Sequence, residues 1–217
     1  INSLDPLTAV SAVDGRYRNT ILELAPIVSE FGLIKNRIHV ECEWLLFLSA
    51  TEEISEVRKL KESEQARIRK IYLDLTVEDA EKVKEIEKTT NHDVKAIEYY
   101  VKDRLKEDPE LVELTEWIHF ACTSEDINNT AYAIMLSQAR SDVLMGVMCK
   151  LTNEIDLMAA SNASIAMLSR THGQVASPTT LGKELRNSSE RLKRQSLQFE
   201  KLEILGKFNG AVGNFNA

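Results

Sequence analysis

Glycine and proline are scarce in this chain of 217 residues, which has 8 Gly and 4 Pro in total, and aromatic residues make up only 6%. Because glycine and proline interrupt regular structure, their sparseness between residues 21 and 168 favours long helices over a sheet with many turns. The hydrophobic content of 43% is enough for a packed core and argues against disorder.

Cysteines and long apolar runs are also few. Cys42, Cys122 and Cys149 are odd in number and far apart, which predicts free thiols in a reducing compartment, the cytoplasm. No cysteine–histidine spacing fits a zinc site, so no metal is expected. No stretch approaches the ~20 apolar residues of a membrane span, and residues 1–6 lack the basic and apolar regions of a signal peptide. We therefore expect no membrane partner.

Positive charge is in deficit, with a formal net charge of −7. Nucleic acid is a poor candidate partner, because binding it depends on a basic face that neutralises phosphates. A small anionic substrate remains compatible with this charge if a local cationic cluster overcomes the global field.

The apolar residues recur at helical spacing, which predicts an all-α fold. Ile27, Phe31, Ile34 and Ile38 mark one helical face. Shorter helices are predicted over 63–75, 77–86 and 93–105. Pro109 ends this pattern, so we predict an N-terminal helical domain over 1–110 and the first part of a helical-bundle domain over 111–217.

Two long helices are predicted in the second domain. Thr123 or Ser124 can begin the first, with acidic residues in its first turn. Ser177 followed by Pro178 is typical of the start of the second. Its apolar seam predicts partner helices elsewhere in the chain or in another subunit. The seam comprises Leu181, Leu185, Ser188, Leu192, Gln195, Phe199 and Leu202. The glycine-punctuated segment 206–217 resembles a loop inside a longer protein, so we expect a truncated bundle.

His172 is the first candidate catalytic residue. It stands in Leu-Ser-Arg-Thr-His-Gly-Gln, residues 168–174. An imidazole with an unperturbed pKa of about 6.5 exchanges protons near neutrality, which suits a general acid. The alternative is a loop histidine that hydrogen-bonds the next helix.

His92 is the second candidate catalytic residue. It lies between Asn91 and Asp93, and Asp93 is a candidate to fix its tautomer or raise its pKa. The same three residues also suit a cap for the following helix, and both interpretations can hold together. Thr123 and Ser124 offer hydroxyl and N–H groups at a helix start, which suits an anion, although ordinary capping explains them on spacing alone.

The remaining polar residues carry weaker signals. Arg16 and Tyr17 follow a turn, and a guanidinium with a phenol suits a phosphate, although such a pair is usually a surface contact. We reject His119 and Cys122 as a nucleophilic pair, because no third group orients them and a core helix face explains both. The weaker candidates near His172 are Gln174, Ser177 and Lys183. His39 lies within a helical pattern, and we expect it to pack or to face solvent.

Four segments in this order resemble the adenylosuccinate lyase family of the fumarase/aspartase superfamily. They are residues 7–17, 89–95, 120–129 and 168–174, and the resemblance extends to the last residue. A Thr-His-Gly motif alone is weak, but four matching segments are specific.

The resemblance implies a cofactor-free β-elimination that cleaves adenylosuccinate to AMP and fumarate, and also splits the succinyl-carboxamide ribotide of purine synthesis. In the family, the histidine matching His172 protonates the leaving nitrogen. The family's segment that matches Asn91 to Asp93 contacts the substrate, and its histidine supports the carboxylate end. The resemblance likewise implies that the Thr123–Ser124 pair binds substrate. Arg16 and Tyr17 become candidates for the nucleotide phosphate, and Gln174 a weaker binding candidate.

The sequence departs from the family in one respect. The family's base is a serine in a Gly-Ser-Ser loop, which does not occur here. Family active sites also combine residues from three subunits of a homotetramer, so we expect this chain alone to be inactive. Alternatives are another lyase of the superfamily, such as argininosuccinate lyase, or a non-catalytic helical interaction module.

Overall fold

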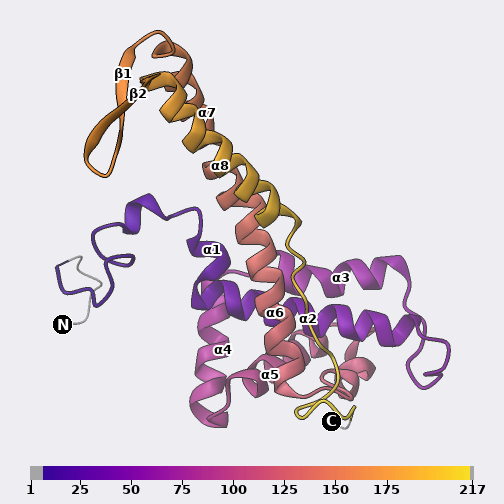
Figure 1. Cartoon of the computed structure of the whole chain (residues 1–217). Helices are drawn as coiled ribbons and strands as arrows, with labels where there is room; N and C mark the ends of the chain where they lie inside the picture. Colours follow the sequence, from indigo (N-terminus) through magenta and orange to yellow (C-terminus); the bar gives the residue numbers. More distant parts are fainter. Residues whose placement is uncertain (1–6, 216–217) are drawn as a thin grey trace. The chain divides into compact units, whose positions relative to one another are not determined.

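The computed structural model of the chain describes residues 7–215. Residues 1–6, which bear on the signal peptide, and residues 216–217, at the end of the glycine-punctuated segment, lie outside this part. The described residues form helices and one two-stranded sheet (Figure 1), so the predicted all-α class is confirmed.

The α-helices of the described part are α1 (Ala25–Val28), α2 (Glu30–Ala50), α3 (Glu62–Leu73), α4 (Val77–Thr90), α5 (Asp93–Lys106), α6 (Ser124–Gln138), α7 (Met145–Ser161) and α8 (Leu181–Lys201). The 3-10 helices are η1 (Arg18–Thr20) and η2 (Val112–Trp117), and η3 (Ala139–Leu144) is a π-helix. The antiparallel strands are β1 (Ala166–Thr171) and β2 (Gln174–Thr180).

The chain divides into two compact units, each described here by itself. The first unit comprises the chain up to Ser137 and again from Ile204 onward. The second comprises Gln138–Glu203. The domain boundary near residues 110 and 111 stays a prediction.

The first unit is organised around α2, which packs against α3, α4 and α5. Large apolar side chains such as Ile38, Leu45, Ile97 and Leu105 are fully buried in its main core. Each such residue contributes about 1.5–3 kcal/mol by leaving water. A second apolar cluster joins α2 and α5 to the first turns of α6, so the residues at the start of α6 rest on a fixed base.

The second unit consists of α7 and α8 side by side with the β1–β2 hairpin between them in sequence (Figure 1). Small residues make the helix contact. A Cβ on Gly182 would lie 2.3 Å from the carbonyl oxygen of Ala159, and the buried hydroxyl of Ser189 donates to Asp156. The residues of the apolar seam predicted along α8 are half-buried or exposed in this unit. The role of that seam in binding partner helices stays a prediction.

The predicted helix start at Ser177 is wrong. Ser177 and Pro178 lie in β2, and α8 begins at Leu181. Thr180 is the N-cap, and its hydroxyl accepts a hydrogen bond from the N–H of Lys183 at 3.2 Å. Pairing with β1 keeps this segment extended, and a two-stranded sheet tolerates proline because both strands are edges.

Candidate active site

The Asn-His-Asp segment is the junction between α4 and α5. Asn91 ends α4 in a left-handed conformation, with a φ of 52° that asparagine tolerates better than most residues. His92 is the N-cap of α5, and its Nδ1 accepts the N–H of Lys95 at 3.2 Å. An accepting nitrogen carries no proton, so this contact leaves the proton of the neutral ring on Nε2.

The capping interpretation of this segment is therefore confirmed, and it fixes the tautomer of His92 through Lys95. Asp93 Oδ1 lies 3.6 Å from His92 Nδ1, beyond a hydrogen bond. The side chain of His92 is 49% exposed, so its free Nε2 edge remains accessible to a ligand.

Asp93 has its own partners. Its Oδ1 accepts the N–H of Val94 at 2.9 Å, and its Oδ2 accepts Nη2 of Arg37 at 2.6 Å. Partial burial alone would raise the pKa of Asp93, but the Val94 N–H and the Arg37 guanidinium outweigh it and hold that pKa below its usual value. Asp93 is therefore a carboxylate at neutral pH.

The Thr123–Ser124 pair lies at the start of α6, as predicted. The N–H of Thr123 donates to Oδ2 of Asp126 at 3.0 Å. Among the described residues, neither hydroxyl makes a hydrogen bond, and both residues are half-buried. Two hydroxyls that the cap does not use, at a helix N-terminus, form a suitable place for an anionic group.

The residues before this helix start adopt an unusual backbone. His119 and Ala121 have φ values of 63° and 56°. Oε2 of Glu41 accepts the N–H of His119 at 3.1 Å, and Oε1 contacts His119 Nδ1 at 2.6 Å. Nε1 of Trp44 donates to the carbonyl of Phe120 at 2.8 Å. These contacts from α2 hold the left-handed turns in place.

His119 and Cys122, which the sequence analysis rejects as a nucleophilic pair, do not occupy the core helix face that it predicts for them. Neither residue lies on a core helix face, because η2 ends at Trp117 and α6 begins at Ser124. Burial raises the pKa of the Cys122 thiol far above its usual value, so it is not a thiolate. Burial lowers the pKa of His119, but the hydrogen bond and charge of Glu41 raise it more, so the net shift is upward.

Asp126 connects the glycine-punctuated segment to the same helix start. Its fully buried carboxylate accepts N–H groups of Asn209 at 3.0 Å and Gly210 at 3.1 Å, and Nζ of Lys207 lies 3.3 Å away. Burial raises the pKa of Asp126, but the N–H groups of Thr123 and Asn209 and the ammonium of Lys207 outweigh it and lower that pKa overall. The segment that the sequence indicates only as a loop is therefore anchored beside Thr123.

His172 occupies the tip of the hairpin in the second unit. Thr171 pairs with Gln174, which leaves His172 and Gly173 as a two-residue loop with φ values of 51° and 77°. Positive φ at both positions is typical of a type I′ turn, and the glycine supplies the second at little steric cost. His172 and the predicted binding residue Gln174 are both exposed.

Arg16 and Tyr17 lie on an exposed turn of the first unit, just before η1. The guanidinium carbon of Arg16 lies 5.5 Å from the centre of the Tyr17 ring. No contact among the described residues joins this pair to the other predicted site residues. His39 stacks on Tyr72 with ring centres 4.2 Å apart, in agreement with its predicted packing role.

The structure thus brings together two of the predicted segments, those of His92 and Thr123, within the first unit. Arg37 joins them through Asp93 and Asn128, while Glu41 and Asp126 hold the chain before and at Thr123. No site role was predicted from the sequence for Arg37, Glu41, Asp126 or Asn128. Arg37 and Glu41 gave a usable signal, since they are charged residues four apart within an apolar helix.

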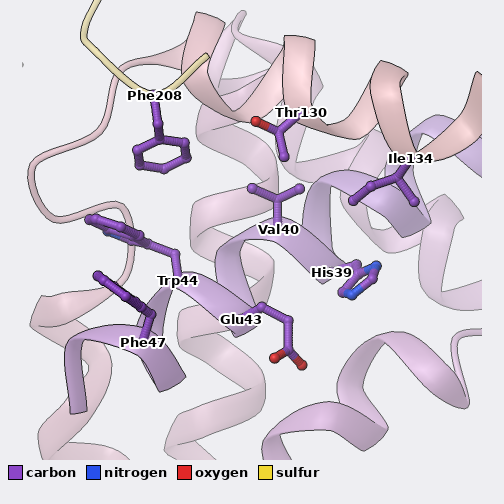
Figure 2. A pocket seen from close by; sticks show the side chains of 8 residues that line it. All are labelled: His39, Val40, Glu43, Trp44, Phe47, Thr130, Ile134 and Phe208. Carbon is purple, nitrogen blue, oxygen red and sulfur yellow. The ribbon is translucent and has the colours of Figure 1, made fainter. Parts of the chain in front are cut away.

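A separate pocket of about 290 Å³ lies between α2, α6 and Phe208 (Figure 2). Its walls are mainly apolar, with Trp44, Phe47 and Phe208 on one side and Ile134 on the other. None of the predicted site residues lines it, so we do not assign the reaction to it. Within residues 7–215, no group of three or more His, Cys, Asp or Glu side chains is arranged to hold a metal ion.

The family model described as Lyase matches residues 15–217. The chain belongs to this lyase family. It is 51% identical over 214 residues to adenylosuccinate lyase of Haemophilus influenzae, 50% to that of Vibrio cholerae and 49% to that of Escherichia coli. Each match covers 99% of this chain and 47% of the relative, so the chain spans about half the length of these relatives. The resemblance drawn from the four segments is confirmed.

Solved structures share the fold at low identity. The 3-carboxy-cis,cis-muconate lactonizing enzyme from Pseudomonas putida matches with a TM-score of 0.68 at 20% identity, over 89% of this chain and 42% of that one. A fumarate lyase from Mesorhizobium sp. BNC1 matches with a TM-score of 0.68 at 18% identity, over 91% and 43%. In the described part of this chain, no helix is both long and apolar enough to cross a membrane.

Proposed function

We propose that the protein containing this chain cleaves adenylosuccinate to AMP and fumarate, and also splits the succinyl-carboxamide ribotide of purine synthesis. The observation that carries this proposal is about 50% identity to adenylosuccinate lyases over 99% of the chain. The same stretch contains the Asn-His-Asp, Thr-Ser and Thr-His-Gly motifs.

The reaction is a β-elimination. A base removes a proton from the carbon next to a carboxylate, the electron pair forms the new double bond, and the carbon–nitrogen bond breaks. Charge delocalisation into that carboxylate makes a cofactor unnecessary. His172 donates the proton that the leaving nitrogen takes up, and its exposed position on a tight turn supports this role.

The first unit binds the anionic ends of the substrate in this proposal. The unengaged hydroxyls of Thr123 and Ser124 and the Nε2–H of His92 donate hydrogen bonds to carboxylate oxygens of the substrate, with Asn91 and Asp93 completing the segment. The N-terminus of α6 favours negative charge there. In the same proposal, Arg16 and Tyr17 bind the nucleotide phosphate and Gln174 contacts substrate near His172.

The base lies outside this sequence in the proposal, because the family's Gly-Ser-Ser loop does not occur among the 217 residues. We further propose a cytoplasmic homotetramer. Exposed leucines along α7 and α8 support it, because such a surface is covered when partner helices complete a bundle.

A direct assay tests the substrate. The full-length gene product is incubated with adenylosuccinate and, separately, with argininosuccinate, and fumarate is followed by absorbance. We expect release from adenylosuccinate alone. Fumarate release from argininosuccinate alone would favour argininosuccinate lyase in place of the proposed activity. Release from neither substrate would overturn the proposal.

The 217-residue chain on its own is the matched control. We expect no turnover from it, because it lacks the base. Turnover near the rate of the full-length protein would contradict the assignment of the base to another part of the protein.

A further inference from the structure

Three side chains of α2 that make hydrogen bonds lie in a stripe along one face of the helix. Arg37, Glu41 and Trp44 are spaced four and then three residues apart, which places them on the same side of the helix. The helix otherwise contributes mainly apolar residues to both clusters of the core. Each member of the stripe contacts a segment that the proposed function uses or the residues just before it.

Arg37 makes the direct connection. Its Nη2 donates to Oδ2 of Asp93 at 2.6 Å, and its Nε donates to Oδ1 of Asn128 at 2.9 Å. Asp93 follows His92 at the start of α5, and Asn128 lies one turn after Ser124 in α6. The Arg37 side chain is only 6% exposed. One rigid guanidinium therefore fixes the spacing between two helix starts.

The other two members hold the approach to α6. Glu41 binds both the N–H and the ring of His119, and Trp44 binds the carbonyl of Phe120. These contacts set the path of the chain into Thr123. The stripe thus fixes both segments to a single helix.

We propose that Arg37 is a positioning residue that sets the distance between the His92 segment and the Thr123–Ser124 helix start. This inference rests on the proposed function, because it assumes that both segments bind one substrate. Arg37 itself touches no substrate.

Stability alone is a weak reason for this arrangement. Burying a guanidinium is costly, and a well-packed apolar side chain of similar volume often stabilises a core as well or better. A planar fork with divergent donors instead fixes the relative position of two acceptors. Lysine offers a single ammonium centre and reproduces that geometry poorly.

The test uses the full-length gene product with three variants at this junction and one control. Arg37→Met removes the fork, Arg37→Lys keeps the charge, and Asn128→Leu removes one acceptor. Arg69→Met is the matched control, because Arg69 also pairs with a carboxylate of α2, Glu43 at 2.8 Å, away from both segments. The readouts are KM and kcat for fumarate release, the melting temperature, and hydrogen exchange over residues 91–95 and 123–128.

We expect the KM of Arg37→Met to rise at least tenfold, with smaller increases for Arg37→Lys and Asn128→Leu and a change below threefold for Arg69→Met. Exchange should accelerate in both segments of Arg37→Met. A merely structural role would lower the melting temperature and the active fraction but leave KM unchanged. If Arg37→Met folds, a KM within twofold of wild type overturns the inference. If Arg37→Met does not fold, the same result in both Arg37→Lys and Asn128→Leu overturns it.

The two proposals fail in different ways. A wild-type protein that releases no fumarate from adenylosuccinate refutes the proposed function. The exchange measurement then still decides whether Arg37 holds the two segments together, because unchanged exchange at both refutes that part as well.

Discussion

The two units differ in what their apolar side chains contact. In the first unit, Ile38 and Ile97 are fully buried among several helices. In the second, Leu151 is 53% and Leu157 62% exposed, and small residues such as Gly182 make the helix contact. The first unit has a core of its own, whereas the second presents an apolar surface that suits further helices.

This difference matters for the site. The His92 and Thr123 segments are held by side chains within their own unit, mainly those of α2. His172 stands on an exposed hairpin tip, which the turn and the strand pairing hold within the described residues. We therefore expect the first unit to keep its geometry in the isolated chain, and the hairpin to depend on the assembled protein.

The largest expected effect separates the two kinds of apolar residue. In the 217-residue chain, Ile97→Ala should cost about 2–5 kcal/mol, because it leaves a cavity in a closed core. Leu157→Ala should change stability by less than about 0.5 kcal/mol. Tryptophan fluorescence follows denaturation of Ile97→Ala, because both tryptophans, Trp44 and Trp117, lie in the first unit. Far-ultraviolet circular dichroism follows denaturation of Leu157→Ala, because it also reports the helices of the second unit. Equal losses in the two variants would break the comparison.

A pair of glycine substitutions probes the second unit. Gly182→Ala should destabilise it by about 1–3 kcal/mol, because the new Cβ meets the backbone of Ala159 and Ala163. Gly146→Ala is the control, since nothing lies within 4 Å of its Cβ position, and it should stabilise α7 by about 0.4–1 kcal/mol. Far-ultraviolet circular dichroism should register both changes while the tryptophan transition stays in place. The opposite order of the two variants would contradict the small-residue contact.

The start of α8 gives a smaller effect. Thr180→Ala should cost about 1 kcal/mol, because it removes the side chain that caps the helix. Ser177→Ala should be near neutral, since Ser177 lies in β2 and its backbone carbonyl, not its hydroxyl, is used by Ser169. Circular dichroism of the two variants distinguishes them. A greater loss from Ser177→Ala would restore the helix start that the sequence predicts.

The smallest expected effect is a pH dependence of the stability of the first unit. Glu41 raises the pKa of His119, so the pair stabilises the folded state fully below the unfolded histidine pKa of about 6.5. That stability is lost as pH rises through the higher folded value. His39, whose pKa is lowered by burial, acts in the opposite sense, so the difference between wild type and Glu41→Gln isolates His119. The free energy of unfolding is measured against pH for both proteins. If it changes with pH in the same way in wild type and Glu41→Gln, the His119–Glu41 pair does not contribute the predicted stability.

The helices of the first unit could be predicted because their signals are local. Pro109 follows the end of α5, and the polar junction at His92 separates α4 from α5. The predicted apolar face is only partly right: Phe31, Ile34 and Ile38 lie on α2, but Ile27 lies in α1, because Ser29 is extended and caps α2. The hairpin could not, because Ser177–Pro178 has a strong local helix-start pattern that strand pairing overrides. The composition of the second unit likewise does not reveal that glycine and serine, rather than leucine, make its helix contact.

The candidate site follows the same rule. His92, Thr123 and His172 were recognisable as polar interruptions of helical pattern, and the structure places each at a cap or a turn. Arg37 and Asp126 were not recognised, because their partners lie 56 and 83 residues away along the chain. Contacts of that range depend on tertiary packing, which periodicity does not encode.

The proposed role of His172 as proton donor tests the account most directly. In the full-length protein, His172→Ala should lower kcat for fumarate release by about 10²–10⁴-fold, because a general acid contributes that much. The melting temperature should stay unchanged, since the side chain is exposed. Val175→Ala on the same hairpin, 62% exposed, should retain kcat within threefold. A His172→Ala protein that turns over adenylosuccinate at the wild-type rate would contradict the central role given to this histidine.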